Sequence, residues 1–154
     1  MEVGKPRFFK WTKYRSKPPA ELGGGQLGDH HPVIVVGAGP VGLALALALA
    51  QYEIPVVLLE AKDHLSDNSR TLAVARRSVQ LLDRLGVAAS FRELAITREF
   101  NYVYHGKQLI HQAPYGWDPQ EKYPDISVLQ QPWTEKILLD GVIASPCIDL
   151  RWRH

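Results

Sequence analysis

Cysteine is almost absent from this chain, since Cys147 is the only one among 154 residues. A single cysteine excludes an internal disulfide and a zinc site built on cysteine ligands. The six histidines include no pair at the i, i+4 spacing of a helix, so no metal site is predicted. The formal net charge of +2 does not indicate nucleic acid as a partner. Contents of 45% hydrophobic and 22% charged residues are ordinary for a soluble protein of one domain at most.

A long uninterrupted apolar run is also missing, although one segment comes close. Residues 33–50 contain no charged or strongly polar side chain over 18 positions, which is the lower length limit of a membrane-spanning helix. Gly37, Gly39 and Pro40 interrupt this segment four residues after it begins. Four β-branched residues before the interruption are typical of a buried parallel strand, so no membrane association is predicted.

The interruption itself is the most informative motif of the chain. It reads Gly-x-Gly-x-x-Gly and comprises Gly37, Ala38, Gly39, Pro40, Val41 and Gly42. An apolar run precedes it, an Ala/Leu segment follows it to Ala50, and a second apolar run ends at Glu60. Strand, glycine turn, helix, strand and acid in this order predict an α/β fold with a Rossmann-like βαβ unit that binds a dinucleotide.

Each part of this motif has a physical task. Gly37 permits a tight turn, Gly39 lets the backbone come close to a pyrophosphate, and Gly42 lets the helix pack closely on the sheet. The helix N-terminus offers unpaired N–H groups and the positive end of its dipole to the phosphates. Glu60 lies 18 positions after Gly42, where its carboxylate can accept both hydroxyls of a ribose.

The Ala/Leu segment is predicted to be a helix even though its leucines alternate with a period of two. Ala and Leu are strong helix formers, and no β-branched residue occurs in it after Val41. Gly42, Ala46 and Ala50 would form a face of small residues, and the leucines would bury the helix nearly all round.

Residues 1–31 differ in composition from the rest and are predicted to be a basic, Pro/Gly-rich tail and linker. They contain Pro18-Pro19 and Gly23-Gly24-Gly25 and have no clear period, so a mobile segment is expected. Their aromatic residues could pack on a partner or on a missing part of the protein: Phe8, Phe9, Trp11 and Tyr14. A basic region before an apolar run resembles a secretory signal, but no convincing small-residue cleavage site follows, and a cytoplasmic location is expected.

Patterns along the rest of the chain predict shorter elements. Apolar residues that repeat at three and four positions, followed by Gly86, predict a helix from Thr71 to Leu85. Further predicted elements are a helix over 88–94, a β-hairpin over 100–111, a strand over 126–129, a helix from Pro132 to 139, and a strand over 148–152.

Several residues occur in an order that resembles a known family. The order is Gly37-Ala-Gly-Pro-Val-Gly42, Glu60, Ser69-Arg70, Leu82-x-x-Leu85-Gly86 and Gln131-Pro-x-x-Glu135-x-x-Leu138. It resembles the N-terminal part of FAD-dependent aromatic-ring hydroxylases, which are flavoprotein monooxygenases of the phenol hydroxylase and hydroxyphenylpropionate hydroxylase type. The resemblance covers residues 32–153. Residues 32–154 are therefore expected to be the truncated N-terminal part of an FAD-binding domain, with a small β-hairpin insertion.

The resemblance implies roles for single residues. Arg70 corresponds to an arginine that reaches FAD near its phosphates, as the bidentate geometry of a guanidinium permits. Gln131 corresponds to a glutamine on the flavin side of the cofactor, and Glu135 is expected only to brace the helix. FAD is the implied cofactor. NAD(P)H is the electron donor in complete members, whose reduced flavin reacts with dioxygen and passes one oxygen atom to an aromatic ring.

The family's later Gly-Asp segment and its substrate sheet are not recognisable here. The predicted function is therefore the FAD-binding portion of an NAD(P)H-dependent aromatic-compound monooxygenase, inactive as an isolated chain. Its catalytic residues are unknown, and an aromatic substrate is expected only if the missing part is supplied. Two alternatives stay open: an NAD(P)-binding module of another oxidoreductase, because Glu60 fits either nucleotide, and a non-enzymatic remnant that acts through the basic aromatic tail. Arg70 and Gln131 favour FAD.

Overall fold

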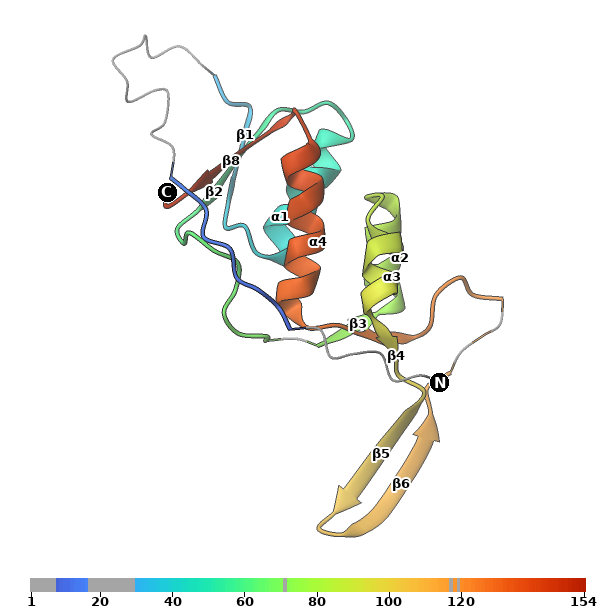
Figure 1. Ribbon diagram of the computed structural model, residues 1–154. Coiled ribbons are helices and arrows are strands. Elements are labelled where there is room, and N and C mark those ends of the chain that lie inside the picture. The colour runs from blue at the N-terminus through green and yellow to red at the C-terminus, as the bar shows by residue number, and fades with distance from the viewer. Residues whose placement is uncertain (1–7, 17–29, 71, 117, 119) are drawn as a thin grey trace.

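The main unit is a three-stranded parallel sheet packed against two helices (Figure 1), in a computed structural model that describes residues 8–16, 30–70, 72–116, 118 and 120–154. The strands are β1 (Val33–Val36), β2 (Val56–Glu60) and β8 (Ile148–Trp152), in the order β1-β2-β8. Leu58 at the centre of β2 pairs with Val35 on one side and with Leu150 on the other. Helices α1 (Pro40–Ala50) and α4 (Gln131–Ala144) contact each other and this sheet. The predicted α/β fold is confirmed.

The apolar segment 33–50 is divided between β1 and α1, and the period-two leucines lie on a helix as predicted. The predicted burial of α1 all round is wrong: Leu43, Ala46 and Leu47 are buried, but Val41 is 81% exposed. One side of the helix packs on the sheet and another on α4, so a third side is left open. No helix among the described residues is long and apolar enough to cross a membrane.

A second unit consists of a small antiparallel sheet and two further helices. The strands are β3 (Ala73–Ala75), β7 (Ile126–Val128) and β4 (Ile96–Thr97), in the order β3-β7-β4. The helices are α2 (Arg76–Arg84) and α3 (Ala88–Leu94), and α3 has the predicted bounds. Gly86, with a φ of 78°, follows α2 as the predicted stop.

The helix predicted from Thr71 to Leu85 is correct only in its second part. Ala73–Ala75 form β3 instead, paired with β7, and Thr71 lies outside the described residues. At the start of α2, the Arg76 guanidinium donates to the Tyr123 carbonyl oxygen (3.0 Å) and forms an ion pair with Asp125. These partners are nearly fifty positions away in the sequence, so long-range pairing overrides a local helical pattern.

The predicted β-hairpin is confirmed and projects from the body of the molecule (Figure 1). It consists of β5 (Phe100–His105) and β6 (Gln108–Pro114), joined by a turn in which Gly106 has a φ of 58°. Its side chains are mostly exposed. Lys107 is its only charged residue.

The N-terminal segment (residues 8–16) packs on the body of this chain, which corrects the expectation of a mobile tail for these residues. The Phe9 ring lies edge-on to Trp133 of α4, with centroids 5.2 Å apart. The Tyr14 ring stacks on Trp152 of β8 at 4.5 Å, and burial raises the pKa of its hydroxyl. Phe9 and Tyr14 thus pack on Trp133 and Trp152 of this chain, whereas the sequence left open a partner or a missing part of the protein. The rest of the predicted tail and linker, residues 1–7 and 17–29, lies outside the described residues.

We predict that Gly42→Ala destabilises the fold and that Gly39→Ala does so far less. A Cβ at Gly42 would lie 1.9 Å from the backbone oxygen of Gly37, whereas a Cβ at Gly39 would meet no protein atom within 4 Å. Urea unfolding should show that the free energy of unfolding falls by at least about 2 kcal/mol in Gly42→Ala and by less than about 1 kcal/mol in Gly39→Ala. Equal losses for the two variants would contradict this packing.

Candidate functional site

The glycine turn connects the end of β1 to the start of α1. Gly37 has a φ of 98°, a left-handed conformation that a residue with a side chain rarely adopts. Its N–H donates to the carbonyl oxygen of Leu59 in β2 (2.7 Å), which fixes the turn to the sheet. Gly39 is the N-cap of α1 and Pro40 begins the helix. The backbone at Gly39 is open, so a ligand can approach the positive end of the α1 dipole there.

Glu60 lies beside this turn, as the βαβ spacing predicts. Its Oε2 accepts a hydrogen bond from the Ala38 N–H (2.7 Å), and its Oε1 accepts one from the Lys62 N–H (3.0 Å). A carboxylate oxygen can accept two hydrogen bonds, so each keeps one position for a further donor such as a ribose hydroxyl. The acid therefore both fixes the glycine turn and retains capacity for a ligand.

The β2–β3 loop (residues 61–70) is fixed to the start of α4 by a buried carboxylate. Glu135 is 1% exposed, and it accepts hydrogen bonds from the Ser66 N–H (2.8 Å) and the Ser66 hydroxyl (2.7 Å). It also accepts one from the Gln131 side-chain amide (2.7 Å), one helical turn earlier. The expectation that Glu135 only braces the helix is too narrow, because it holds the loop as well. The i, i+4 spacing of Gln131 and Glu135 places both on one helix face, but nothing local pointed to Ser66.

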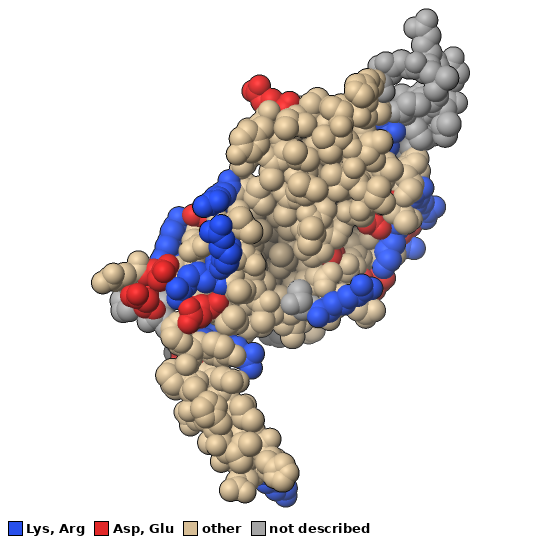
Figure 2. Space-filling model, turned by 180° about the vertical axis from the view of Figure 1, so that it is seen from behind, with Lys and Arg blue, Asp and Glu red and all other residues tan. Residues whose placement is uncertain are grey.

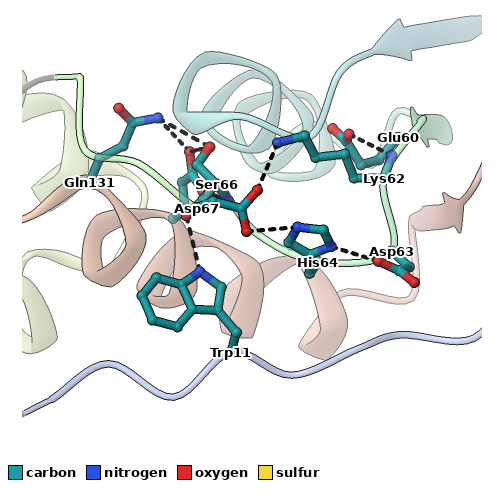
Figure 3. Close-up of polar contacts among 9 residues, drawn as sticks. Trp11, Glu60, Lys62, Asp63, His64, Ser66, Asp67 and Gln131 are labelled. Atoms are coloured by element: carbon teal, nitrogen blue, oxygen red, sulfur yellow. Dashed lines mark hydrogen bonds and ion pairs between the residues drawn. The ribbon is translucent and has the colours of Figure 1, made fainter.

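Gln131 and Arg70 are brought together at the end of this loop. The Gln131 Oε1 accepts a hydrogen bond from the Arg70 N–H (3.0 Å), and the Gln131 N–H donates to the Ser69 hydroxyl (3.1 Å). Figure 3 shows the Gln131 amide directed at Ser66. The Gln131 side chain is therefore occupied by protein groups at both ends, and the Arg70 side chain is exposed. Their predicted contacts with a cofactor stay predictions.

An apolar groove of about 710 Å³ is lined by residues of α1, α2 and α4. Pro40 and Val41 line it at the start of α1, Leu81 lines it from α2, and Gln131 and Thr134 line it from α4. Figure 2, which views the molecule from behind, shows a face whose centre is free of charged side chains, with Lys and Arg along both margins. The start of α1 and the start of α4 thus open onto one cavity.

The arrangement suits a ligand with a diphosphate, a ribose and an extended apolar part. An open helix N-terminus, a carboxylate with free acceptor positions and an arginine on a neighbouring loop match the first two groups. Among the described residues no group of three or more His, Cys, Asp or Glu could hold a metal ion. The site can bind and orient such a ligand, and a redox step there would need a cofactor.

Comparison with known proteins agrees with this geometry. Residues 30–154 match the model of a family described as the FAD binding domain. Over 124 residues the chain is 32% identical to para-nitrophenol 4-monooxygenase from Pseudomonas sp. (strain WBC-3), covering 79% of this chain and 31% of that protein. It is 25% identical over 128 residues to the 3-(3-hydroxy-phenyl)propionate/3-hydroxycinnamic acid hydroxylase of Mycobacterium sp. (strain JLS), covering 79% of this chain and 22% of that protein.

The fold also matches that of a solved monooxygenase structure. The crystal structure of p-nitrophenol 4-monooxygenase PnpA from Pseudomonas putida DLL-E4 superposes with a TM-score of 0.73 at 29% identity. The superposition covers 79% of this chain and 31% of that one. The chain therefore spans about a fifth to a third of the length of the relatives that it matches.

We predict that Glu135→Gln destabilises the chain and loosens the β2–β3 loop. Glu135 now accepts three hydrogen bonds, from the Ser66 N–H, the Ser66 hydroxyl and the Gln131 side-chain amide. A glutamine would direct its own N–H at one of these donors, which would then be buried without an acceptor. Thermal unfolding should show that the free energy of unfolding falls by about 1 to 3 kcal/mol. The control is Lys136→Gln at the next position, where a half-exposed ion pair with Asp140 should contribute less than about 0.5 kcal/mol. Equal stability of Glu135→Gln and the unmodified chain would contradict the bracing role.

Proposed function

Because the chain belongs to the FAD-binding domain family of the aromatic flavin monooxygenases, we propose that it forms the FAD-binding portion of an NAD(P)H-dependent aromatic-compound monooxygenase. The observation that carries the proposal is the hydrogen bond between the Ala38 N–H and the Glu60 carboxylate. It holds the open helix N-terminus and the acid side by side, as the neighbouring pyrophosphate and ribose of an adenine dinucleotide require.

Each predicted residue then has a task in holding the cofactor. The open backbone at Gly39 and the N–H groups at the start of α1 receive the pyrophosphate. Glu60 accepts the ribose hydroxyls through its remaining lone pairs, and Arg70 balances phosphate charge from the β2–β3 loop. Gln131 lines the groove, and in this proposal the flavin side of the cofactor lies next to it. When bound, FAD would supply the electron transfer and the oxygen chemistry.

The aromatic substrate and the nicotinamide donor belong to this proposal only for a complete enzyme. The described residues supply contacts for a cofactor, and no residue is assigned a catalytic step. Exclusion of water protects the reactive forms of such a cofactor, and the groove beside Gln131 is open to solvent. We therefore propose that the 154-residue chain binds FAD without hydroxylating an aromatic compound. A cytoplasmic location is part of the same proposal.

We predict that Gly39→Val abolishes binding of ADP and FAD. A branched side chain at this position would occupy the space through which the pyrophosphate approaches the backbone. Because an added Cβ meets no protein atom there, the variant should still fold, with a loss of about 1 kcal/mol from the changed N-cap. Isothermal titration calorimetry measures the binding, and circular dichroism checks the fold. Equal ADP affinity for the folded variant and the unmodified chain would argue against the site.

We further predict that the unmodified chain binds ADP at least about tenfold more tightly than 2′-phospho-ADP, and that Glu60→Gln narrows this difference. The Glu60 carboxylate accepts ribose hydroxyls but repels a phosphate at the same place. The glutamine keeps the length of the side chain and one acceptor oxygen, but its amide N–H would face either the Ala38 N–H or the Lys62 N–H. Circular dichroism and thermal unfolding therefore check that the variant keeps its fold before the two affinities are compared. Equal affinity of the unmodified chain for both ligands would refute this role. Binding of NAD⁺ in preference to FAD would favour the alternative, an NAD(P)-binding module.

A further inference from the structure

His64 of the β2–β3 loop lies between two carboxylates, one at each ring nitrogen (Figure 3). Its Nδ1 is 2.6 Å from Asp63 Oδ1, and its Nε2 is 2.8 Å from Asp67 Oδ1. A neutral imidazole carries a single N–H and would leave one carboxylate facing a lone pair. Only the imidazolium, which donates from both nitrogens, satisfies both contacts. His64 in its charged form therefore joins two positions of the same loop.

The two carboxylates also contact cations. Asp63 pairs with Arg153, which follows β8, and Asp67 pairs with Lys62 at 3.3 Å. His64 thus sits at the centre of a chain of alternating charges, Lys62–Asp67–His64–Asp63–Arg153, that runs along the loop to the end of the central sheet. Because both acids have a second partner, they remain charged and in place over a wide pH range.

Two other elements pack around this chain of charges. The N-terminal segment contributes Tyr14, whose N–H donates to the Asp63 carbonyl oxygen (2.7 Å), and Trp11, whose indole N–H donates to the Ser66 carbonyl oxygen (3.2 Å). Helix α4 contributes Lys136 and Asp140, an ion pair near Tyr14. The raised pKa of Tyr14 keeps its hydroxyl neutral at pH values where histidine titrates. Among these groups His64 is the one whose ordinary pKa lies near neutral pH. His154, which follows Arg153 and whose N–H donates to the Glu60 carbonyl oxygen (3.0 Å), is a second histidine beside the loop, so the pKa of His64 itself has to be followed.

The loop that His64 joins lies between the two ends of the proposed cofactor site, because it begins directly after Glu60 of β2 and ends at Arg70. At its start, the Lys62 N–H donates to Glu60, and at its end, the Arg70 N–H donates to Gln131. We propose that His64 is a positioning residue for cofactor binding: its imidazolium, held by Asp63 and Asp67, keeps the β2–β3 loop in the conformation that presents Glu60 and Arg70. This inference rests on the proposed function, because it assumes that the ligand binds between these two residues.

The sign of the pH dependence follows from the two carboxylates. Hydrogen bonds from Asp63 and Asp67 raise the pKa of His64 above its ordinary value. Arg153 and His64 hold the pKa of Asp63 well below its usual range, and His64 lowers that of Asp67. The contribution of the imidazolium is complete below the ordinary histidine pKa and is lost as the pH rises through the raised pKa. The acids lose their charge only at strongly acidic pH, so ligand affinity should be highest in mildly acidic to neutral solution and fall on the alkaline side.

The test uses the full chain and ADP-ribose, because its pyrophosphate has no terminal phosphate that titrates near pH 6. Calorimetry from about pH 6 to about pH 9 gives the affinity, and NMR of the histidine ring gives the pKa of His64 with and without ligand. We expect affinity to fall about three- to tenfold as the pH rises through the His64 pKa, and that pKa to be higher in the complex. A linked change of one pKa unit corresponds to tenfold in affinity.

Three variants separate a positioning role from a merely structural one. His64→Gln should bind ADP-ribose with the same affinity at every pH, equal to the weaker affinity that the unmodified chain has in alkaline solution. Asp67→Asn leaves His64 with one carboxylate, so the fall in affinity should move to lower pH. His111→Gln, a matched change on the exposed strand β6, should keep the curve of the unmodified chain.

The outcomes distinguish the two proposals. If ADP-ribose does not bind at any pH, the proposed function fails and this inference fails with it. If ADP-ribose binds but the His64 pKa is the same with and without ligand, the inference alone is overturned, even if no variant folds. Equal pH profiles for His64→Gln and the unmodified chain would overturn it as well.

Discussion

The buried carboxylate of Glu135 is the constraint on which the site depends. A charge that is 1% exposed is tolerated only when hydrogen-bond donors surround it, and here Ser66 and Gln131 supply them. Ser66 belongs to the β2–β3 loop, and Gln131 holds the backbone of Arg70 at the end of that loop. The N-terminal segment bonds to the same loop at Ser66 and Asp63. One acid on α4 therefore sets the position of a loop that belongs to the first half of the chain.

Features that depend on residues close together in the chain were predicted correctly from the sequence. The glycine turn, the helix after it and Glu60 at the end of β2 follow from a strand–turn–helix–strand pattern in fewer than thirty residues, because each requirement acts on near neighbours. The hairpin was equally local. The closeness of Glu60 and the glycine turn could be inferred before the structure, since adjacent parallel strands end at the same edge of a sheet.

What could not be predicted depends on contacts between distant segments. Ala73–Ala75 read as helix because their partners in β7 are about fifty residues away. No local pattern indicated that Phe9 and Tyr14 pack on tryptophan rings of α4 and β8. None indicated either that the Gln131 side-chain amide accepts from Arg70 and donates to Glu135. The residues next to a polar residue at a helix start do not indicate which distant loop will pack against it.

The strand order β1-β2-β8 has a consequence for the order in which the molecule is assembled during synthesis. The glycine turn and Glu60 leave the ribosome early, but β2 is central in the sheet and gains its second neighbour only with residues 148–152. The groups that fix the β2–β3 loop, Glu135 and Arg153, also come late. Closing such long loops is slow, because chain entropy must be lost before the contacts form. The glycine turn and Glu60 are therefore encoded by residues 37–60, but the strand and the ion pair that hold β2 and its loop form only with residues 148–153.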